Sequence, residues 1–476
     1  MINKADKGLY IWQADNLLTA TQKVNGRWLN ESLPSLEKIK SVKISTDTRS
    51  ISKGDIFLAL SGDNFDGHNY AKMAVEKGAV AVIVEREIAE LSESTNLDLP
   101  QLIVSDSRLA LGQLSGFRRR QHKDVQIIAI TGSSGKTTVK EMLGSIFSNI
   151  APTLVTRGNL NNDLGVPMML LELSDEHKFA ILELGANHIG EIAYTANIVQ
   201  PDVVAILNIG TAHLGEFGGR EGICKAKSEI YQVLDSTKTA VVPELDAFAG
   251  QLKSIASRHT NQIIGFGKTD VTVSDLQISP LSSQFMLNVG DARQSVTLPL
   301  AGEHNVINAM AVTACAIAVG ISLEQIAQGL SQVKPPRGRL YSQTVGKHLL
   351  IDDTYNANPN SIKAGASVVM AQAGKKVLVL GDISELGDEA QNEHYKLGQD
   401  LAKMGMEYIF ALGEFAQNTV DGANKIGDIQ AVAYTDKSQL LADLQTFIIN
   451  NKEEACTVLF KGSRFMKMET LFEALI

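Results

Sequence analysis

The stretch that decides the fold is Ile127-Ile128-Ala129-Ile130-Thr131-Gly132-Ser133-Ser134-Gly135-Lys136-Thr137-Thr138. Its apolar first half has the pattern of a buried β-strand, and its second half is a glycine-rich turn. The residues that follow have helical spacing and one apolar face, made by Val139, Met142, Leu143, Ile146 and Phe147. A strand, a glycine-rich loop and a helix in this order form a cradle for a nucleoside triphosphate. We therefore expect ATP to bind at Gly132, Ser133, Ser134, Gly135, Lys136, Thr137 and Thr138.

The loop departs from the strict phosphate-loop pattern, because Ile130 stands where that pattern has its first glycine. The alternative is an ordinary glycine-rich turn with a surface lysine. The strand and helix on either side favour the phosphate cradle, since backbone N–H groups meet phosphate at the N-terminus of a helix.

Composition places the chain among ordinary globular proteins. Its 476 residues favour about three domains, and 44% hydrophobic with 20% charged residues suits a sizeable core. The net charge of −9 argues against nucleic acid as the main partner, because no dominant basic surface would neutralise phosphates. The one compact basic run, Arg118-Arg119-Arg120, is expected to be a solvated helix end.

Cys224, Cys315 and Cys456 lie far apart and fit no metal-binding spacing, which favours reduced thiols. No charged N-terminal region leads into a continuous apolar stretch, and no run is long enough to cross a bilayer. We expect a cytoplasmic protein without a membrane span.

Strand-like and helical segments alternate along the chain and predict parallel sheets covered by helices. We expect an α/β protein of three domains, at residues 1–106, 107–334 and 335–476, with Pro335-Pro336 at the last boundary. A connecting helix is predicted over 107–122. The predicted strands are 79–84, 125–130, 179–184, 203–208, 348–351, 376–380, 408–412 and 457–460. Glycines close to three of the last four strand ends predict an open sheet beside a ligand crevice.

Three side chains beyond the loop are candidates for chemistry. Glu183 ends an apolar strand, where a carboxylate can hold Mg²⁺, although a lone acid there is by default solvated. His213 follows the next strand and points at the same edge of the sheet, where a histidine taken alone is as often structural as functional. Lys227 lies on a probable helix and, taken alone, is an unremarkable surface lysine.

Several motifs in register resemble the Mur ligases, the ATP-dependent amide-forming enzymes of peptidoglycan synthesis. The resemblance runs nearly end to end. The central motifs are Thr-Gly-x-x-Gly-Lys-Thr-Thr from Thr131, Asn-Leu-Asn-Asn-Asp-Leu-Gly-Val-Pro from Asn159, Glu-Leu-Gly from Glu183, Asn-x-Gly-x-x-His-Leu from Asn208, Lys-x-Glu-Ile from Lys227 and Gly-Glu-His-Asn-Val-Ile-Asn-Ala from Gly302. The C-terminal motifs are Gly338-Arg339-Leu340 and Asp-Asp-Thr-Tyr-Asn-Ala-Asn-Pro from Asp352.

Within that family the chain looks most like the branch that joins D-alanyl-D-alanine to UDP-N-acetylmuramoyl-tripeptide. The segment 353–359 has the form typical of this branch, as does 381–387 with His394, although Ile383 replaces its usual methionine. The chain lacks Asp-Asn-Pro-Arg, the amino-acid motif of the ligase that adds the third residue. Asp47-Thr48-Arg49, residues 54–57 and Phe65-Asp66-Gly67-His68 resemble the uridine-nucleotide domain that the two ligases share.

The resemblance implies the fold of each domain: an N-terminal uridine-nucleotide-binding α/β domain, a central P-loop ATPase-like parallel-sheet domain and a C-terminal Rossmann-like α/β domain for the incoming amine. It also implies roles around ATP. Lys136 would bind the β- and γ-phosphates. Thr137 and Glu183 would hold one Mg²⁺ and His213 would help hold a second. Lys227 would react with CO₂ to form a carbamate that faces the metal.

Further roles follow from the same resemblance. Asn305 and Asn308 would contact adenine, Asp353 the ribose, and Arg339 the γ-phosphate when the last domain closes. Lys136, Lys227, His213 and Arg339 form the expected catalytic set. The residues expected to contact the other substrates are Thr48, Arg49, Asp66, His68, Asn161, Asn162, Asn356, Ser463 and Arg464.

The implied reaction has two steps. The tripeptide carboxylate takes the γ-phosphoryl group, and the amine of D-alanyl-D-alanine then displaces phosphate. One alternative is a related ligase that adds a single amino acid, and a more remote one is a non-catalytic ATP-dependent switch. The third residue of the tripeptide stays open between diaminopimelate and lysine. We expect a monomer.

Overall fold

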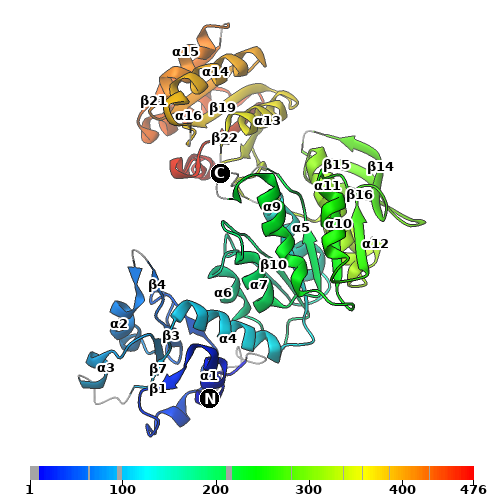
Figure 1. The fold of residues 1–476 in the computed structure, drawn as a ribbon. Coiled ribbons are helices and arrows are strands. Elements are labelled where there is room, and N and C mark those ends of the chain that lie inside the picture. Colours follow the sequence, from blue (N-terminus) through cyan, green and yellow to red (C-terminus); the bar gives the residue numbers. More distant parts are fainter. Residues whose placement is uncertain are drawn as a thin grey trace. The chain divides into compact units, whose positions relative to one another are not determined.

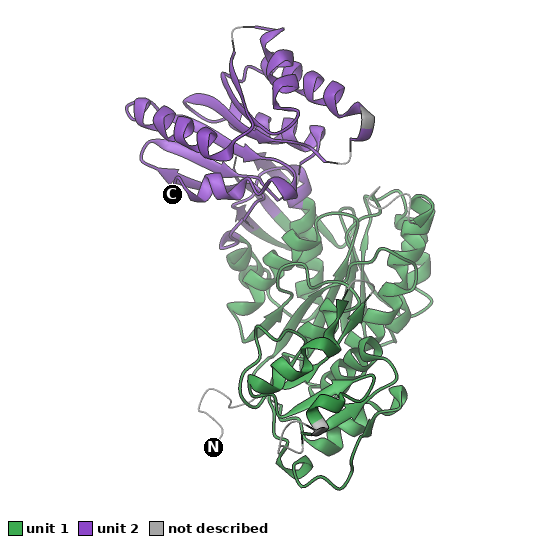
Figure 2. Ribbon diagram, turned by 90° about the vertical axis from the view of Figure 1, so that its left-hand side faces the viewer, with its two compact units in different colours: residues 1–274, 287–294, 307–330 green, residues 275–286, 295–306, 331–476 purple. Residues whose placement is uncertain are grey.

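The structure is a computed structural model that describes residues 10–62, 65–93, 99–210, 217–279, 281–335, 337–355, 357–384, 386–427 and 429–476. The chain divides into two units. Unit 1 comprises residues 1–274, 287–294 and 307–330, and unit 2 comprises residues 275–286, 295–306 and 331–476. Figure 2 colours the two units, and Figure 1 labels their helices and strands.

The N-terminal part of unit 1 is built on a five-stranded sheet of order β1-β7-β6-β3-β2. These strands are β1 (Arg27–Trp28), β2 (Ile44–Ser45), β3 (Ile56–Leu58), β6 (Ala81–Val84) and β7 (Gln101–Ile103). A small hairpin pairs β4 (Ser61–Gly62) with β5 (Phe65–Asp66). The helices are α1 (Ala14–Ala20), η2 (Gln22–Val24), η3 (Leu36–Lys38), η4 (Gly67–Tyr70), α2 (Ala71–Glu76) and α3 (Ala89–Glu93).

Helix α4 (Ser107–Gln121) follows this sheet and confirms the predicted connecting helix. The expectation of a solvated basic end was wrong for Arg118 and Arg119, which are buried, and only Arg120 is exposed. Arg118 donates to the Leu173 carbonyl, and its guanidinium lies 5.1 Å from the Tyr10 ring centroid. Arg119 donates to the carbonyls of His122, Val125, Val199 and Gln200. Carbonyl acceptors make burial of these guanidinium groups possible, and a charge pattern alone does not reveal such acceptors.

The central sheet has the order β16-β15-β14-β13-β12-β11-β8-β10-β9, and the pairs from β9 to β14 are parallel. Its strands are β8 (Gln126–Thr131), β9 (Thr153–Val155), β10 (Phe179–Glu183), β11 (Val203–Ile206), β12 (Thr239–Pro243), β13 (Gln262–Phe266), β14 (Val271–Ile278), β15 (Ser283–Val289) and β16 (Ala292–Leu298). The division between the units passes through β14, β15, β16 and α11.

Helices lie between these strands or follow them along the chain. They are α5 (Lys136–Ser148), α6 (Gly165–Leu170), α7 (Glu191–Val199), α9 (Arg220–Ser228), η5 (Glu229–Val233), α10 (Ala249–Ala256), α11 (Glu303–Ala318) and α12 (Leu323–Ser331). The five apolar residues predicted to face the core from α5 are all fully buried. Strands β8, β10 and β11 are parallel, so their carboxyl ends lie at the same edge of the sheet. The phosphate loop follows β8 at this edge.

The last part of unit 2 is a six-stranded sheet of order β17-β18-β22-β19-β20-β21. Its strands are β17 (Tyr341–Val345), β18 (His348–Asp352), β19 (Lys375–Gly381), β20 (Tyr408–Leu412), β21 (Gln430–Tyr434) and β22 (Cys456–Lys461). All pairs are parallel except β17 with β18. The helices are α13 (Pro359–Met370), η6 (Gly387–Glu389), α14 (Ala390–Lys403), α15 (Ala416–Asn424), α16 (Lys437–Asn450), η7 (Arg464–Met466) and α17 (Glu469–Glu473).

The eight predicted strands correspond to β6, β8, β10, β11, β18, β19, β20 and β22, with bounds that differ by two residues at most. Cys224, Cys315 and Cys456 are buried and form no disulfide. Within the part of the chain that the structure describes, no helix is both long and apolar enough to cross a membrane.

Candidate active site

The phosphate loop connects β8 to α5, as its sequence pattern predicts. Gly135 has a φ of +82°, a left-handed conformation that glycine adopts without strain. Its Cα also lies against Asn308, because a Cβ atom built on Gly135 would come within 2.7 Å of Asn308 Oδ1. The loop therefore requires glycine at this position for two separate reasons.

Asn208, at the end of β11, binds the same loop. Its Oδ1 accepts the Ser134 N–H at 3.0 Å, and its Nδ2 donates to the Ser134 carbonyl at 3.1 Å. Two residues further on, the Gly210 N–H donates to Ser133 Oγ at 2.9 Å. These contacts hold the loop in shape from the segment that follows the neighbouring strand.

Lys136 begins α5, and its Nζ donates to the Gly132 carbonyl at 2.8 Å. The ammonium group thus lies above the first residue of the loop, on the side where phosphate would lie in such a cradle. Thr137 follows, with its hydroxyl directed at the end of β10. The arrangement fits a triphosphate with its metal ion, because it combines backbone N–H groups, one cation and one hydroxyl.

Glu183 ends β10 and is only 3% exposed. Its Oε1 accepts from Asn161 Nδ2 at 2.8 Å, and Thr137 Oγ1 lies 3.4 Å from its Oε2. The Glu183 N–H donates to Thr156 Oγ1 at 3.0 Å, which fixes the start of the side chain. A carboxylate and a hydroxyl at this distance are an oxygen donor pair of the kind that Mg²⁺ prefers, and Asn161 orients the carboxylate.

Lys227 is 5% exposed, so the surface-lysine interpretation was wrong. Burial, with a smaller effect from the neighbouring charge of Lys136, lowers the pKa of Lys227 to about 7. Among the described residues, no carboxylate or hydrogen-bond acceptor pairs with its Nζ. A buried amine in this state is half neutral near pH 7, and a neutral amine is the form that reacts as a nucleophile.

His213 lies outside the described residues, so its predicted role as a metal ligand stays a prediction. In the described part of the chain, His, Cys, Asp and Glu side chains form no group of three that could hold a metal ion. The donor set that the structure brings together is therefore Thr137 with Glu183.

Asn305 and Asn308 both lie on the first two turns of α11 and are buried, with exposures of 8% and 7%. Asn308 lies against Gly135, as described above, which places it beside the phosphate loop. Asn305 Nδ2 donates to the Ala301 carbonyl at 2.7 Å. Asn308 is thus next to the cradle within unit 1, and Asn305 belongs to unit 2.

In unit 2, Arg339 lies in the turn before β17, and its guanidinium is 4.2 Å from the Tyr355 ring centroid. Asp353 follows β18, and its carboxylate contacts Lys461 Nζ. Burial raises the pKa of the Asp353 carboxyl, and the nearby charge of Lys461 opposes that shift. Arg339 and Asp353 thus belong to neighbouring turns of one unit.

Ser463 follows β22 and is buried. Its Oγ accepts the Ser384 N–H at 2.8 Å and lies 3.1 Å from Ser384 Oγ. Arg464 is exposed and pairs with Glu469 at 2.9 Å. Ser463 and Arg464 thus have different partners among the contacts given for the described residues, and Asn356 lies outside those residues.

The predicted uridine-side residues form two local clusters. Arg49 pairs with Asp47 at 2.7 Å, and this contact lowers the pKa of Asp47 to about 2. The Thr48 carbonyl accepts from Lys77 Nζ at 2.9 Å. Asp66 contacts His68 Nδ1 and Arg86, each at 2.6 Å. Asn162 Oδ1 accepts the Gly165 N–H at 2.8 Å and so shapes the segment that carries Asn161.

Sequence reasoning missed the structural roles of Asn208, Asp352, Tyr355 and Lys461. All four lie within or beside motifs already noted, so position in a motif was the available signal. The contacts that these residues make depend on tertiary packing, and spacing in the sequence does not specify that packing.

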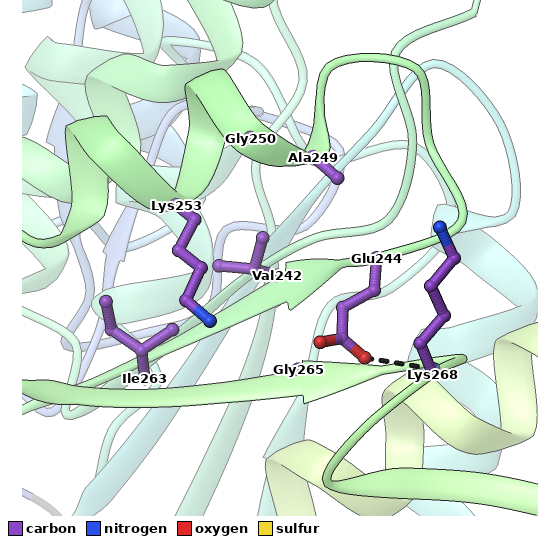
Figure 3. A pocket seen from close by; sticks show the side chains of 8 residues that line it. All are labelled: Val242, Glu244, Ala249, Gly250, Lys253, Ile263, Gly265 and Lys268. Carbon is purple, nitrogen blue, oxygen red and sulfur yellow. Dashed lines mark hydrogen bonds between the residues drawn. The ribbon is translucent and has the colours of Figure 1, made fainter.

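A cavity of about 190 Å³ lies elsewhere in unit 1, between α10 and the strands β12 and β13. Figure 3 shows Lys253, Lys268 and Glu244 around it, with the Lys268 N–H donating to Glu244. Glu244 also accepts from the N–H and hydroxyl of Thr269. These donors satisfy the carboxylate within the protein, and none of the predicted site residues lines the cavity.

Three family models match the chain in order. They describe a Mur ligase family catalytic domain at residues 41–119, a Mur ligase middle domain at 130–316 and a Mur ligase glutamate ligase domain at 338–464. The matches confirm the expected α/β class with three domains. The exact boundaries after residues 106 and 334 stay predictions.

Individual proteins are similar over nearly the whole chain. The UDP-N-acetylmuramoyl-tripeptide--D-alanyl-D-alanine ligase of Escherichia coli K12 is 38% identical over 435 residues, which are 91% of this chain and 93% of that protein. A crystal structure of MurF from Acinetobacter baumannii is 49% identical, covers 98% of this chain and 99% of its own, and has a TM-score of 0.91. A structure of the UDP-N-acetylmuramoylalanyl-D-glutamyl-2,6-diaminopimelate--D-alanyl-D-alanyl ligase from the same organism is 48% identical with the same coverage and a TM-score of 0.87.

Proposed function

The chain belongs to the Mur ligase family, and from this premise we propose how its residues carry out an amide-forming reaction. The enzyme is an ATP-dependent ligase that joins D-alanyl-D-alanine to UDP-N-acetylmuramoyl-tripeptide and forms ADP and phosphate. The name of the 48%-identical relative supports diaminopimelate as the third residue of the tripeptide.

One observation carries the assignment of roles: in one unit, Lys136 lies in the phosphate loop, the neighbouring Thr137 contacts the buried Glu183, and the charge of Lys136 acts on the buried Lys227. A switch that only binds ATP needs no buried lysine near its phosphate loop. This arrangement supports phosphoryl transfer to a carboxylate rather than nucleotide binding alone.

In the first step, the terminal carboxylate of the tripeptide attacks the γ-phosphorus, and an acyl phosphate and ADP form. Lys136 neutralises charge on the transferred group, and Arg339 adds a second cation from unit 2. When bound, Mg²⁺ supplies charge neutralisation and alignment of the phosphates. Thr137 and Glu183 would hold it, with Asn161 orienting the Glu183 carboxylate.

In the second step, the amine of D-alanyl-D-alanine attacks the acyl carbon and phosphate leaves. No protein nucleophile takes part, so the protein's task is to orient the two substrates and exclude water. Ser463, Arg464 and Asn356 are proposed to contact the incoming dipeptide. Thr48, Arg49, Asp66 and His68 are proposed to contact the uridine nucleotide, and Asn161 and Asn162 the muramoyl peptide.

We assign Lys227 the role of a carbamate. Its neutral amine would attack CO₂ and lose a proton, so that an anion replaces a cation beside the metal site. The lowered pKa of Lys227 and its lack of a carboxylate partner among the described residues support this role. His213 would help hold a second Mg²⁺, while Asn305, Asn308 and Asp353 would bind the adenosine.

A cytoplasmic location and a monomeric state complete the proposal. The reaction consumes ATP and a nucleotide-linked substrate, which supports the location. Sedimentation equilibrium of the full chain tests the state, and a mass of twice the chain would contradict a monomer.

Phosphate release tests the function. The enzyme is incubated with ATP, Mg²⁺ and UDP-N-acetylmuramoyl-tripeptide, and then with D-alanyl-D-alanine or with single amino acids. We expect release only with the dipeptide. Release with a single amino acid would favour a ligase that adds one residue, and release without any amine or carboxylate would favour the ATP-dependent switch.

A further inference from the structure

The turn that carries Arg339 is bound by one segment, Asp352–Tyr355. Asp352 Oδ2 accepts the Gly338 N–H at 2.9 Å, and Asp353 Oδ1 accepts the Leu340 N–H at 3.3 Å. The Tyr355 N–H donates to the Gly338 carbonyl at 3.0 Å. The backbone on both sides of Arg339 is therefore tied to residues 352, 353 and 355, at and just after the end of β18.

Asp352 is 2% exposed, and both of its oxygens are engaged within the protein. Besides the Gly338 N–H, it accepts the Thr354 N–H at 3.2 Å and the Thr354 hydroxyl at 2.6 Å. Hydrogen bonds to a buried carboxylate are charge-assisted and strong. Asp352 thus fixes the turn but has no exposed oxygen for a substrate.

The turn has a backbone conformation that needs such support. Gly338 has a φ of +78° and Leu340 a φ of +55°, which is strained for a branched residue. A Cβ atom on Gly338 would come within 3.0 Å of the Tyr355 nitrogen. Strained residues keep their conformation only where their surroundings determine it, and here the surroundings are residues 352–355.

The side chain of Arg339 is bound by the same segment. Its guanidinium lies 4.2 Å from the Tyr355 ring centroid, within the range of a cation–π interaction. Tyr355 is 47% exposed, so the stacked guanidinium lies at the surface of unit 2, where it can be presented to a ligand.

We propose that Asp352 is a positioning residue of the ligase reaction: by holding Gly338 it sets where Arg339 presents its guanidinium to the γ-phosphate. The proposal rests on the role of Arg339 given under Proposed function. It gives different roles to the two adjacent acids at the end of β18: Asp353 is proposed to bind ribose, and Asp352 acts only through Arg339.

The test is a double-mutant cycle on the full-length enzyme with Asp352→Asn and Arg339→Ala, measuring kcat, the KM for ATP and the KM for D-alanyl-D-alanine. We expect Asp352→Asn to lower kcat roughly ten- to hundredfold, because small misplacement of a catalytic group has effects of this size. The KM for the dipeptide should not change. In the Arg339→Ala background, Asp352→Asn should lower kcat no further.

Two controls separate positioning from a general structural role. Thr354→Val removes one partner of Asp352 but leaves its bond to Gly338, and Asp436→Asn makes the same chemical change at the helix cap of α16. Both should retain nearly wild-type kcat. Equal losses in Thr354→Val and Asp352→Asn, or a further loss from Asp352→Asn without Arg339, would overturn the role of Asp352.

The outcomes distinguish this inference from its premise. Wild-type kcat in Arg339→Ala would overturn the role of Arg339 and the proposal with it. A loss in Arg339→Ala with wild-type kcat in Asp352→Asn would overturn the role of Asp352 alone. If Asp352→Asn does not fold, Gly338→Ala decides, because a methyl group at a φ of +78° and within 3.0 Å of the Tyr355 nitrogen displaces the turn without changing a carboxylate. We expect lower kcat in that variant, and unchanged kcat would overturn the proposal.

Discussion

Asn308 on α11 lies directly against Gly135 in the phosphate loop, so that a Cβ atom on Gly135 would come within 2.7 Å of Asn308 Oδ1. This contact ties the helix with the proposed adenine-binding amides to the loop with the proposed phosphate-binding amides. Asn308 and the phosphate loop are therefore adjacent within unit 1, whereas Asn305 belongs to unit 2.

Gly135→Ala should weaken nucleotide binding. The added methyl group both strains a φ of +82° and displaces Asn308. Gly320→Ala is the matched control, because Gly320 has the same φ of +82° but no atom within 4 Å of a built Cβ. We expect each variant to lose about 1–2 kcal/mol of stability from backbone strain. Calorimetric titration with ADP should show weaker binding only for Gly135→Ala. Equal affinities in the two variants would contradict the contact.

Lys227→Met should abolish most turnover and stabilise the enzyme in CO₂-free buffer at neutral pH. The folded-state pKa of Lys227 is lowered to about 7 from 10.5, so the unfolded chain binds more protons between these values. The free energy of unfolding of the wild type therefore rises with pH across that window. The stability difference between Lys227→Met and the wild type should shrink from pH 7 to about 10.5. Thermal unfolding against pH checks the trend, and a constant difference would contradict the burial of the amine.

The carbamate itself has a separate readout. Enzyme depleted of CO₂ should regain turnover when bicarbonate is added, and ¹³C-labelled bicarbonate should give a carbamate signal in the wild-type enzyme that Lys227→Met lacks. A signal that persists in the variant would place the carbamate on another residue.

Asn161→Ala should raise the Mg²⁺ concentration needed for half-maximal turnover. Asn161 donates to Glu183 at 2.8 Å and so orients the proposed metal-binding carboxylate. Loss of such a supporting contact costs about 10- to 100-fold in metal affinity. Asn197→Ala is the control, since Asn197 is exposed on α7 and its side chain donates to the Ala193 carbonyl of the same helix. A Mg²⁺ titration of both variants checks this, and matching curves would contradict the role of Asn161.

Arg118→Ala should destabilise unit 1, whereas Arg120→Ala should not. The Leu173 carbonyl would lose its buried guanidinium donor, and an unsatisfied buried group costs about 1–3 kcal/mol. Arg120 is exposed, so its loss should change stability by less than about 0.5 kcal/mol. Urea unfolding of the two variants measures the difference. Equal stabilities of the two variants would contradict the structural role of Arg118 and would support the original prediction of a solvated helix end.

The sequence predicted eight strands whose residues are mostly buried, but not the parallel strands β2, β3, β7, β9, β12, β13 and β21. Residues 127–130 of β8 and 180–182 of β10 form continuous apolar runs, and such runs indicate strands in helix-covered sheets. Strands β14, β15 and β16 were missed because polar and partly buried residues interrupt their pattern. The edge strand β17 was missed for the same reason, since only intermediate and exposed residues make it up.

The site was predictable as a set of residue types but not as a set of contacts. The glycine pattern indicated the loop, and resemblance to a family brought Glu183 and Lys227 to it. Burial of Lys227 depends on the surrounding core of unit 1. The contacts that hold Arg339 and its turn depend on the segment at the end of β18. Tertiary packing decides both, and it leaves no periodic signal in the sequence.

The central claim is that the tripeptide carboxylate is activated by phosphoryl transfer before D-alanyl-D-alanine attacks. Tripeptide substrate labelled with ¹⁸O in its terminal carboxylate is incubated with ATP, Mg²⁺, D-alanyl-D-alanine and the enzyme, and the released phosphate is analysed by mass spectrometry. The account predicts that each phosphate carries one oxygen from the labelled carboxylate. Release of unlabelled phosphate together with formation of the amide product would contradict it.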